Sequence, residues 1–144
     1  MKRFAYAIIF ALLLAGCSSE QTSKTLSVEE QLALQYVEQF LNNKDVEVKR
    51  KFVEEHVHPD VKQLFSLAAN ATSESNAVLS DTTVVGSVDY ERDGKKGKTI
   101  LVRGKNIKGE EAERIFLILD GKFAWGFSEA SNKKVFQELR GKFK

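Results

Sequence analysis

The sequence predicts an α+β fold in which N-terminal helices pack on a four-stranded antiparallel meander sheet and a last helix follows the sheet. Apolar residues recur every three or four positions up to about residue 69 and at every second position from Thr82 onward, which is a change from helical to strand periodicity. Turns rich in Asp, Asn and Gly separate the alternating segments, as in antiparallel hairpins. A sheet of this size cannot shield its apolar face alone, so we expect the helices to lie across it.

The first residues of the chain carry a separate signal. Lys2 and Arg3 are followed by an apolar run over residues 4–14, and small residues then precede the single cysteine in Leu14-Ala15-Gly16-Cys17. This pattern resembles the lipobox of bacterial prolipoproteins, in which a lipid is attached to the cysteine and the peptide is cut before it. The resemblance implies a lipid-anchored protein on the extracytoplasmic face of a bacterial cell membrane, with Cys17 as the lipidated residue.

Two other interpretations of this segment stay open. A membrane-spanning helix needs about 20 apolar residues, and this run is nearer in length to the apolar part of a signal peptide. An ordinary signal peptide with an incidental cysteine is the second alternative. With a lipid on its sulfur, Cys17 could take no part in disulfides, metal binding or catalysis. We predict a signal peptide over residues 1–16, a lipidated cysteine and tether over residues 17–26, and one domain over residues 27–144.

The composition limits the classes of function. Without residues 1–16 the chain keeps 128 of its 144 residues, which is enough for one domain that needs no disulfide. Lys2 and Arg3 account for the whole net charge of +2, so the rest of the chain has 20 basic and 20 acidic side chains. A nucleic-acid-binding protein would carry a surplus of positive charge, and we therefore expect no nucleic acid as a partner.

The helical half begins with an N-terminal signature. Ser27-Val28-Glu29-Glu30 fits a capping box, in which a Ser hydroxyl and a Glu carboxylate satisfy backbone amides at the start of the helix. The first helix ends at Asn42-Asn43, and its apolar stripe consists of Ala33, Tyr36, Val37, Phe40 and Leu41. We expect a second helix from Asp45 to about residue 55 and a third from Pro59 to about residue 69, since proline favours the first position of a helix.

The alternating half predicts four strands, over residues 82–92, 99–105, 111–119 and 122–127, and then a helix over about residues 131–140. Residues 93–97 form a glycine-rich turn, and Asp120-Gly121 signals a two-residue hairpin. On the first strand, the residues expected to share one face are Val84, Gly86, Val88 and Tyr90. On the last strand, the residues expected to share one face are Phe123, Trp125 and Phe127, with Trp125 buried against the helices.

Two segments carry a resemblance to a known family. They are the end of the first helix, Phe40-Leu41-Asn42-Asn43-Lys44-Asp45, and the closing hairpin, Leu117-Ile118-Leu119-Asp120-Gly121-Lys122-Phe123-Ala124-Trp125. With the order of elements, they resemble the NTF2-like superfamily, particularly its small bacterial lipoproteins of unknown function. NTF2-like enzymes, as a family, hold acid–base residues in the cone between sheet and helices, and the candidates here are Tyr36, Asp89, Tyr90 and Arg114, although we expect Asp89 to face solvent. The C-terminal helix departs from the commonest NTF2-like pattern, and a cystatin-like helix-on-sheet arrangement is the near alternative.

One cluster has residue types that bind metals. His56, His58 and Asp60 form an H-x-H-x-D pattern, and two imidazoles with a carboxylate can hold a metal ion on a strand or loop. On a helix, residues two apart point away from each other, and a solvated connection between helices is the alternative. The glycines punctuate hairpins and form no phosphate-binding loop, so we expect no cofactor.

The segment from Arg92 to Lys108 holds seven basic side chains and one acidic side chain. Its residues around the turn are candidates for contact with anionic headgroups or wall polymers: Arg92, Lys95, Lys96 and Lys98. The alternative is a solvated hairpin that lysines protect from edge pairing.

Three functions fit these observations. The leading one is a non-catalytic module that binds an envelope protein or a small ligand, since apolar residues are abundant and convergent polar groups are not evident. The alternatives are an NTF2-like hydrolase or isomerase with a polar pair in the sheet–helix pocket, and a structural role at the membrane surface through the basic hairpin. An enzyme should show two or more ionisable side chains that converge in that pocket.

Overall fold

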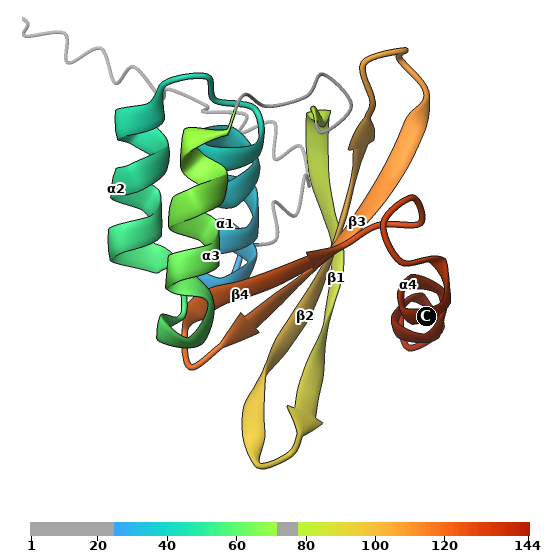
Figure 1. Ribbon diagram of the computed structural model, residues 1–144. Coiled ribbons are helices and arrows are strands. Elements are labelled where there is room, and N and C mark those ends of the chain that lie inside the picture. Colours follow the sequence, from blue (N-terminus) through green and yellow to red (C-terminus); the bar gives the residue numbers. More distant parts are fainter. Residues whose placement is uncertain (1–24, 72–77) are drawn as a thin grey trace, which may run out of the picture.

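The computed structural model describes residues 25–71 and 78–144. Within them, helices precede a four-stranded antiparallel meander and one helix follows it, so the predicted α+β class is confirmed (Figure 1). The helices are α1 (Val28–Tyr36), which continues into the π-helical turn η1 (Val37–Leu41), α2 (Val46–His56), α3 (Pro59–Asn70) and α4 (Lys133–Arg140). The strands are β1 (Ser80–Arg92), β2 (Lys95–Lys105), β3 (Glu111–Leu119) and β4 (Lys122–Phe127). No helix in this described part of the chain is long and apolar enough to cross a membrane.

The helices begin where the sequence predicts. In the capping box of α1, the Glu30 amide donates to Ser27 Oγ at 3.1 Å, and the Ser27 amide donates to Glu30 Oε2 at 3.0 Å. Asp45 caps α2 through its side chain, and Pro59 opens α3. These local signals need no tertiary contact, because each satisfies or removes a backbone amide that the first turn of a helix leaves unpaired.

Asn42, at the end of η1, also fixes where β1 begins. Its side-chain amide donates to the Leu79 carbonyl at 2.7 Å, and its side-chain oxygen accepts from the Leu79 amide at 3.0 Å. Both backbone groups of the residue before β1 are therefore held by one side chain from the helical layer.

The strands follow one another in the order β1-β2-β3-β4, and all neighbours are antiparallel. Asp93-Gly94 joins β1 to β2 with φ angles of 52° and 76°, and Asp120-Gly121 joins β3 to β4 with φ angles of 50° and 72°. Positive φ at both residues gives a turn whose twist matches that of the strands. The turn is therefore shorter than the predicted one over residues 93–97, and Arg92 pairs with Lys95 across it. It closes within two residues because aspartate tolerates positive φ.

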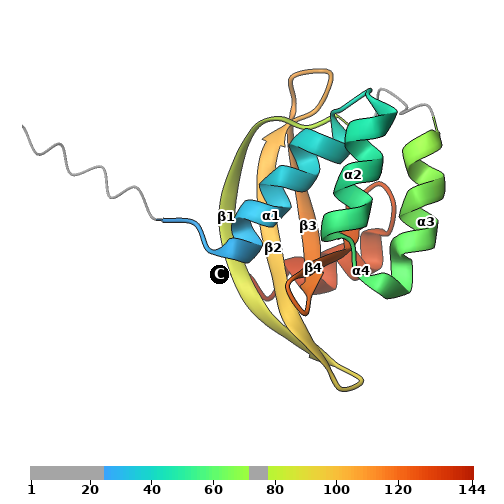
Figure 2. The same cartoon turned by 90° about the vertical axis from the view of Figure 1, so that its left-hand side faces the viewer.

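The sheet is covered on both faces. Helices α1, α2 and α3 lie across one face, and α4 lies behind the other (Figure 2). Between the N-terminal helices and the sheet, Tyr36 stacks on Phe123 with ring centroids 3.9 Å apart. The aromatic core consists of Tyr36, Phe40, Phe52, Phe65, Phe116 and Phe123. These buried rings occupy the space in which the sequence predicts a sheet–helix pocket.

A second, smaller core lies beneath α4. Phe136 and Leu139 of α4, together with Phe143, pack against Leu101 and Ile115 of the central strands. The inward orientation of Phe136 and Leu139 agrees with the helical periodicity of the sequence. Because α4 covers this face, both faces of the central strands carry apolar side chains, and apolar residues follow one another without a break over residues 100–102 of β2 and 115–119 of β3.

The prediction that Val84 shares one face of β1 with Val88 and Tyr90 is wrong. The Val84 side chain packs against the core under the N-terminal helices, whereas Val88 and Tyr90 pack on the α4 side. The pairing with β2 is irregular between Val84 and Gly86. A bulge inserts one extra residue into a strand, and side chains beyond it therefore change face.

The prediction that Phe123 and Phe127 share one face of β4 is also wrong, and the reason is again an irregular pairing. Phe123 is buried in the aromatic core, whereas Phe127 packs on the α4 side, because the pairing with β3 skips Ala124. Trp125 touches Phe65 of α3 with ring centroids 5.9 Å apart, yet it stays 39% exposed. The prediction that Trp125 is buried against the helices is therefore wrong.

Candidate functional site

The outer edge of β3 is half covered. β4 pairs with β3 between Leu119 and Ile115, and the chain then leaves the sheet toward α4. Residues 111–114 have β2 on one side and, within the described chain, no strand on the other. In Figure 1 this stretch belongs to the end of the β2–β3 hairpin that reaches beyond β4. An unpaired strand edge presents backbone N–H and C=O groups that can receive another strand.

A hollow of about 770 Å³ adjoins this edge. Its walls come from the β2–β3 turn, the first half of β3, the connection between β4 and α4, and the start of α4. The apolar part of the lining is Ile107, Ala112, Ala130 and Phe136, and the rest is polar or charged. The usual small-molecule site is lined mainly by apolar side chains, whereas this mostly charged hollow suits a polar or charged ligand.

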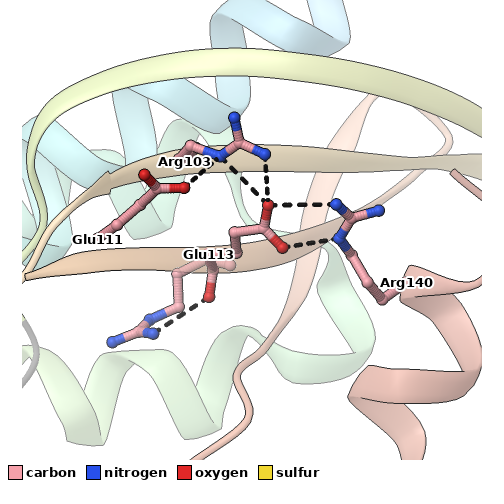
Figure 3. A network of polar contacts seen from close by, with 5 residues as sticks. Arg103, Glu111, Glu113 and Arg140 are labelled. Carbon is pink, nitrogen blue, oxygen red and sulfur yellow. Dashed lines mark hydrogen bonds and ion pairs between the residues drawn. The ribbon is translucent and has the colours of Figure 1, made fainter. Parts of the chain in front are cut away.

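Glu113, in the wall nearest α4, joins three elements (Figure 3). Its Oε1 accepts from Arg103 Nη2 at 2.9 Å, and its Oε2 accepts from Arg140 Nε at 2.7 Å. Arg103 also pairs with Glu111 at 3.0 Å. The hydrogen bond from Arg140 is the main cause that lowers the pKa of Glu113, and Arg103 adds to it. The network ties α4 to β2 and β3 and keeps Glu113 ionised.

Arg114 is the cation on the opposite side of the same edge. By strand alternation it shares the face of Phe116, which the N-terminal helices cover. Its Nη1 donates to the Glu113 carbonyl at 3.2 Å, and no carboxylate in the described part of the chain pairs with it. Burial lowers the pKa of Arg114, and its electrostatic interaction with Tyr36 opposes that shift.

The candidate pocket residues do not all converge. Tyr36 lies in the aromatic core, where burial raises its pKa far above the usual range. Arg114 interacts with Tyr36 from the edge of that core. Tyr90 packs on the other face of the sheet, and Asp89 is exposed, as expected. The structure thus brings together Tyr36 and Arg114 but not Tyr90.

The two histidines of the candidate metal cluster have different neighbours. His56 Nε2 lies 3.0 Å from Gln35 Nε2. His58 Nδ1 accepts from the Asp60 amide at 3.3 Å, which makes it the N-cap of α3, and its Nε2 lies 3.6 Å from Asp120 Oδ2. Among the residues described, no three His, Cys, Asp or Glu side chains are arranged to hold a metal ion.

The four candidate surface-contact residues of the basic hairpin each have an acidic neighbour. The shortest contact is the hydrogen bond from Lys95 Nζ to Asp60 Oδ2, at 2.6 Å. The other neighbours, by ion pair or by position across the ladder, are Arg92 with Asp93, Lys96 with Glu91, and Lys98 with Asp89. The segment that begins at Arg92 leaves out Asp89 and Glu91 of β1, which lie across the ladder from Lys98 and Lys96. The hairpin of β1 and β2 is therefore less basic than this segment alone indicates.

Sequence reasoning missed the network around Glu113. Alternation places Glu111 and Glu113 on one face, and the pairing of β2 with β3 places Arg103 directly across from Glu113. That part of the network follows once the register is known. Arg140 arrives with α4, and no local pattern indicates where α4 packs.

Cys17, the candidate lipidation site, lies outside the described residues. In comparisons with known proteins, no family, no curated protein and no solved structure matches the chain. Function must therefore be inferred from the residues of this chain themselves.

Proposed function

We propose that this protein is a lipoprotein anchored to the extracytoplasmic face of a bacterial cell membrane, and that its domain is a non-catalytic binding module. The observation that carries the proposal is Leu14-Ala15-Gly16-Cys17, which follows a basic start and an apolar run. Small side chains suit the cleavage site of a signal peptide, and a cysteine can carry a lipid. Each buried methylene of such a lipid contributes about 0.8 kcal/mol to membrane attachment.

The distance between the anchor and the domain is short. Residues 18–25 are mostly polar, and such a segment spans at most about 25–30 Å when extended. The capped start of α1 at Ser27 follows almost at once. An anchor on Cys17 therefore keeps the domain near the headgroups and near other proteins of the membrane surface.

Tyr36 and Arg114 do converge at the edge of the aromatic core, but two features favour binding over catalysis. The space between sheet and helices holds packed aromatic rings, and burial moves the pKa of Tyr36 away from neutral pH. A general acid or base needs the opposite, a pKa close to the working pH. The open edge of β3, by contrast, is a concave surface with apolar and charged side chains.

Replacement of Cys17 tests the anchor. Cells that express the full chain are fed an alkyne-tagged fatty acid, and the tag on the protein is measured after coupling to a fluorophore. The wild type should be labelled and recovered with the membranes, and Cys17→Ala should be neither. Ser18→Ala is the matched control, because it changes the neighbouring residue and leaves the thiol in place. Label on the Cys17→Ala protein would rule out the proposed anchor.

A further inference from the structure

We propose that the open edge of β3 binds an extended peptide segment of a partner protein, and that a carboxylate side chain of this segment pairs with Arg114. The proposal names the chemistry of the partner and rests on the binding role proposed above. It does not depend on the lipid anchor.

The backbone of residues 111–114 can receive a strand. β4 occupies the outer side of β3 from Ile115 onward, and a peptide along residues 111–114 would continue that line. Four residues of strand are about 13 Å long, and the adjoining hollow of about 770 Å³ has room for the side chains of such a segment. Main-chain hydrogen bonds give this mode of recognition its affinity, and pockets for alternate side chains give it specificity.

The charge of the hollow favours an acidic segment. Its charged lining is Lys108, Glu111, Glu113, Arg114, Glu129 and Lys133. Arginines of the network compensate the first two glutamates, and Glu129 lies 3.9 Å from Lys133. Lys108 and Arg114 are both cations, and neither forms an ion pair with a carboxylate among the described residues. The charge left for a ligand to neutralise is therefore positive.

Arg114 is better placed than a surface lysine to recognise a carboxylate. A guanidinium has five N–H donors in a planar fork that fits a carboxylate with two parallel hydrogen bonds. One donor of Arg114 is used on the Glu113 carbonyl, so the others can serve a ligand. The group is also half-buried, so a carboxylate beside it would be shielded from water and held more strongly than at an exposed site.

The apolar residues that line the hollow can contact the side chains that flank the carboxylate in the bound peptide. Ile107 is 58% exposed at the β2–β3 turn, so its side chain is available for contact. Together with Ala112 and Phe136 it lines the hollow on either side of the strand edge. A segment with a carboxylate between β-branched residues matches this surface.

Two peptides that differ by one group test the proposal. The probes are fluorescein-labelled Thr-Val-Glu-Val-Thr and Thr-Val-Gln-Val-Thr with blocked termini, and the anisotropy of each is measured with the full chain in detergent. The Glu peptide should bind about tenfold more tightly than the Gln peptide, as expected for a charge-assisted hydrogen bond. Arg114→Gln should remove that difference. Lys98→Gln, which removes a cation at the other end of β2, should preserve it.

A second measurement does not depend on a variant that folds. Addition of the Glu peptide to the wild type should shift the amide resonances of residues 111–114 and slow the solvent exchange of those amides that point away from β2. No binding of the Glu peptide, equal binding of both peptides, or shifts confined to other residues would each overturn the proposal. Labelling at Cys17 is scored on the same protein: failed peptide binding with a labelled cysteine refutes the peptide site, and peptide binding without a label refutes the anchor.

Discussion

Glu113 accepts hydrogen bonds from arginines of two different elements, Arg103 of β2 and Arg140 of α4. Its side chain is 20% exposed, so solvent screens this network in part. We expect Glu113→Gln to lower the free energy of unfolding at neutral pH by about 1–3 kcal/mol, because screening reduces the usual contribution of about 1.5–3 kcal/mol for a hydrogen bond to a charged group. Urea denaturation measures this change. Glu138→Gln, at an exposed position of α4, is the matched control and should stay close to the wild type.

The same residue gives the protein a specific pH dependence. Its pKa in the folded state is lowered from the usual 4.5. Glu113 therefore contributes its full stabilisation above the pKa of the unfolded chain and loses it as pH falls through the lower, folded value. Between neutral pH and the region below 4.5, wild type and Glu113→Gln should converge in stability. A constant difference between them across this range would contradict the assigned role of Glu113.

Trp125 and Phe123 lie two residues apart and should respond very differently to truncation. Phe123 is fully buried in the aromatic core, whereas Trp125 is 39% exposed and rests on Phe65. Phe123→Ala should cost about 3–5 kcal/mol, as is usual for a buried aromatic residue, and Trp125→Ala about 1 kcal/mol. Iodide should quench the fluorescence of the folded protein. Equal costs, or an emission that iodide cannot reach, would place Trp125 in the core after all.

These two residues also show where sequence reasoning stops. Alternation identifies β4 and its apolar content correctly, because the period of a strand is set by its own backbone. It fails at Ala124, where the pairing with β3 skips a residue. A bulge depends on the partner strand, so it cannot be read from the bulged strand alone.

At the scale of elements, the close contact between β2 and β3 depends on Gly97. A Cβ at this position would overlap the backbone carbonyl of Ile118, which cannot move without breaking the ladder. Gly97→Ala should therefore cost more than about 3 kcal/mol, above the common range for overpacking. Gly86→Ala is the matched control in the neighbouring strand, because its Cβ would meet the Phe143 ring at an ordinary 3.7 Å. It should change stability by less than about 1 kcal/mol. Thermal unfolding of both variants tests the contrast, and similar melting temperatures would refute it.

Element boundaries could be predicted where a local group sets them. The Ser27 capping box, Pro59 and the Asp120-Gly121 turn each act through backbone amides or dihedral angles within a few residues. The length of β2 could not, because Arg92 and Lys95 pair only when the Asp93-Gly94 turn closes in two residues. Glycine-rich sequence allows both a long and a short turn, and the register of the two strands decides between them.

At the scale of the whole molecule, the fold class followed from the order of periodicities, but the candidate site did not. The hollow is assembled from the β2–β3 turn with the adjoining edge of β3 and from residues 129–136 around the start of α4, and the whole of β4 separates these two parts in the sequence. Its existence depends on where β4 ends and where α4 packs, and both are tertiary outcomes. Arg114 could be singled out as an ionisable residue in a strand, but its place at an open edge could not.

The connection between α2 and α3 has a consequence for how many copies of the domain can share a surface. Val57 forms a parallel bridge to Phe123, and the His58 amide donates to the Phe123 carbonyl at 2.8 Å, so part of the free side of β4 is already occupied. At the other margin, the irregular pairing of β1 near Val84 disturbs the regular repeat that a neighbouring sheet would need. The lipid anchor proposed on Cys17 would confine the domain to two dimensions, where identical copies meet more often than in solution. The partly occupied side of β4 and the irregular start of β1 would hinder pairing between such copies, whereas the short open stretch of β3 can receive one partner strand without starting a continuous array.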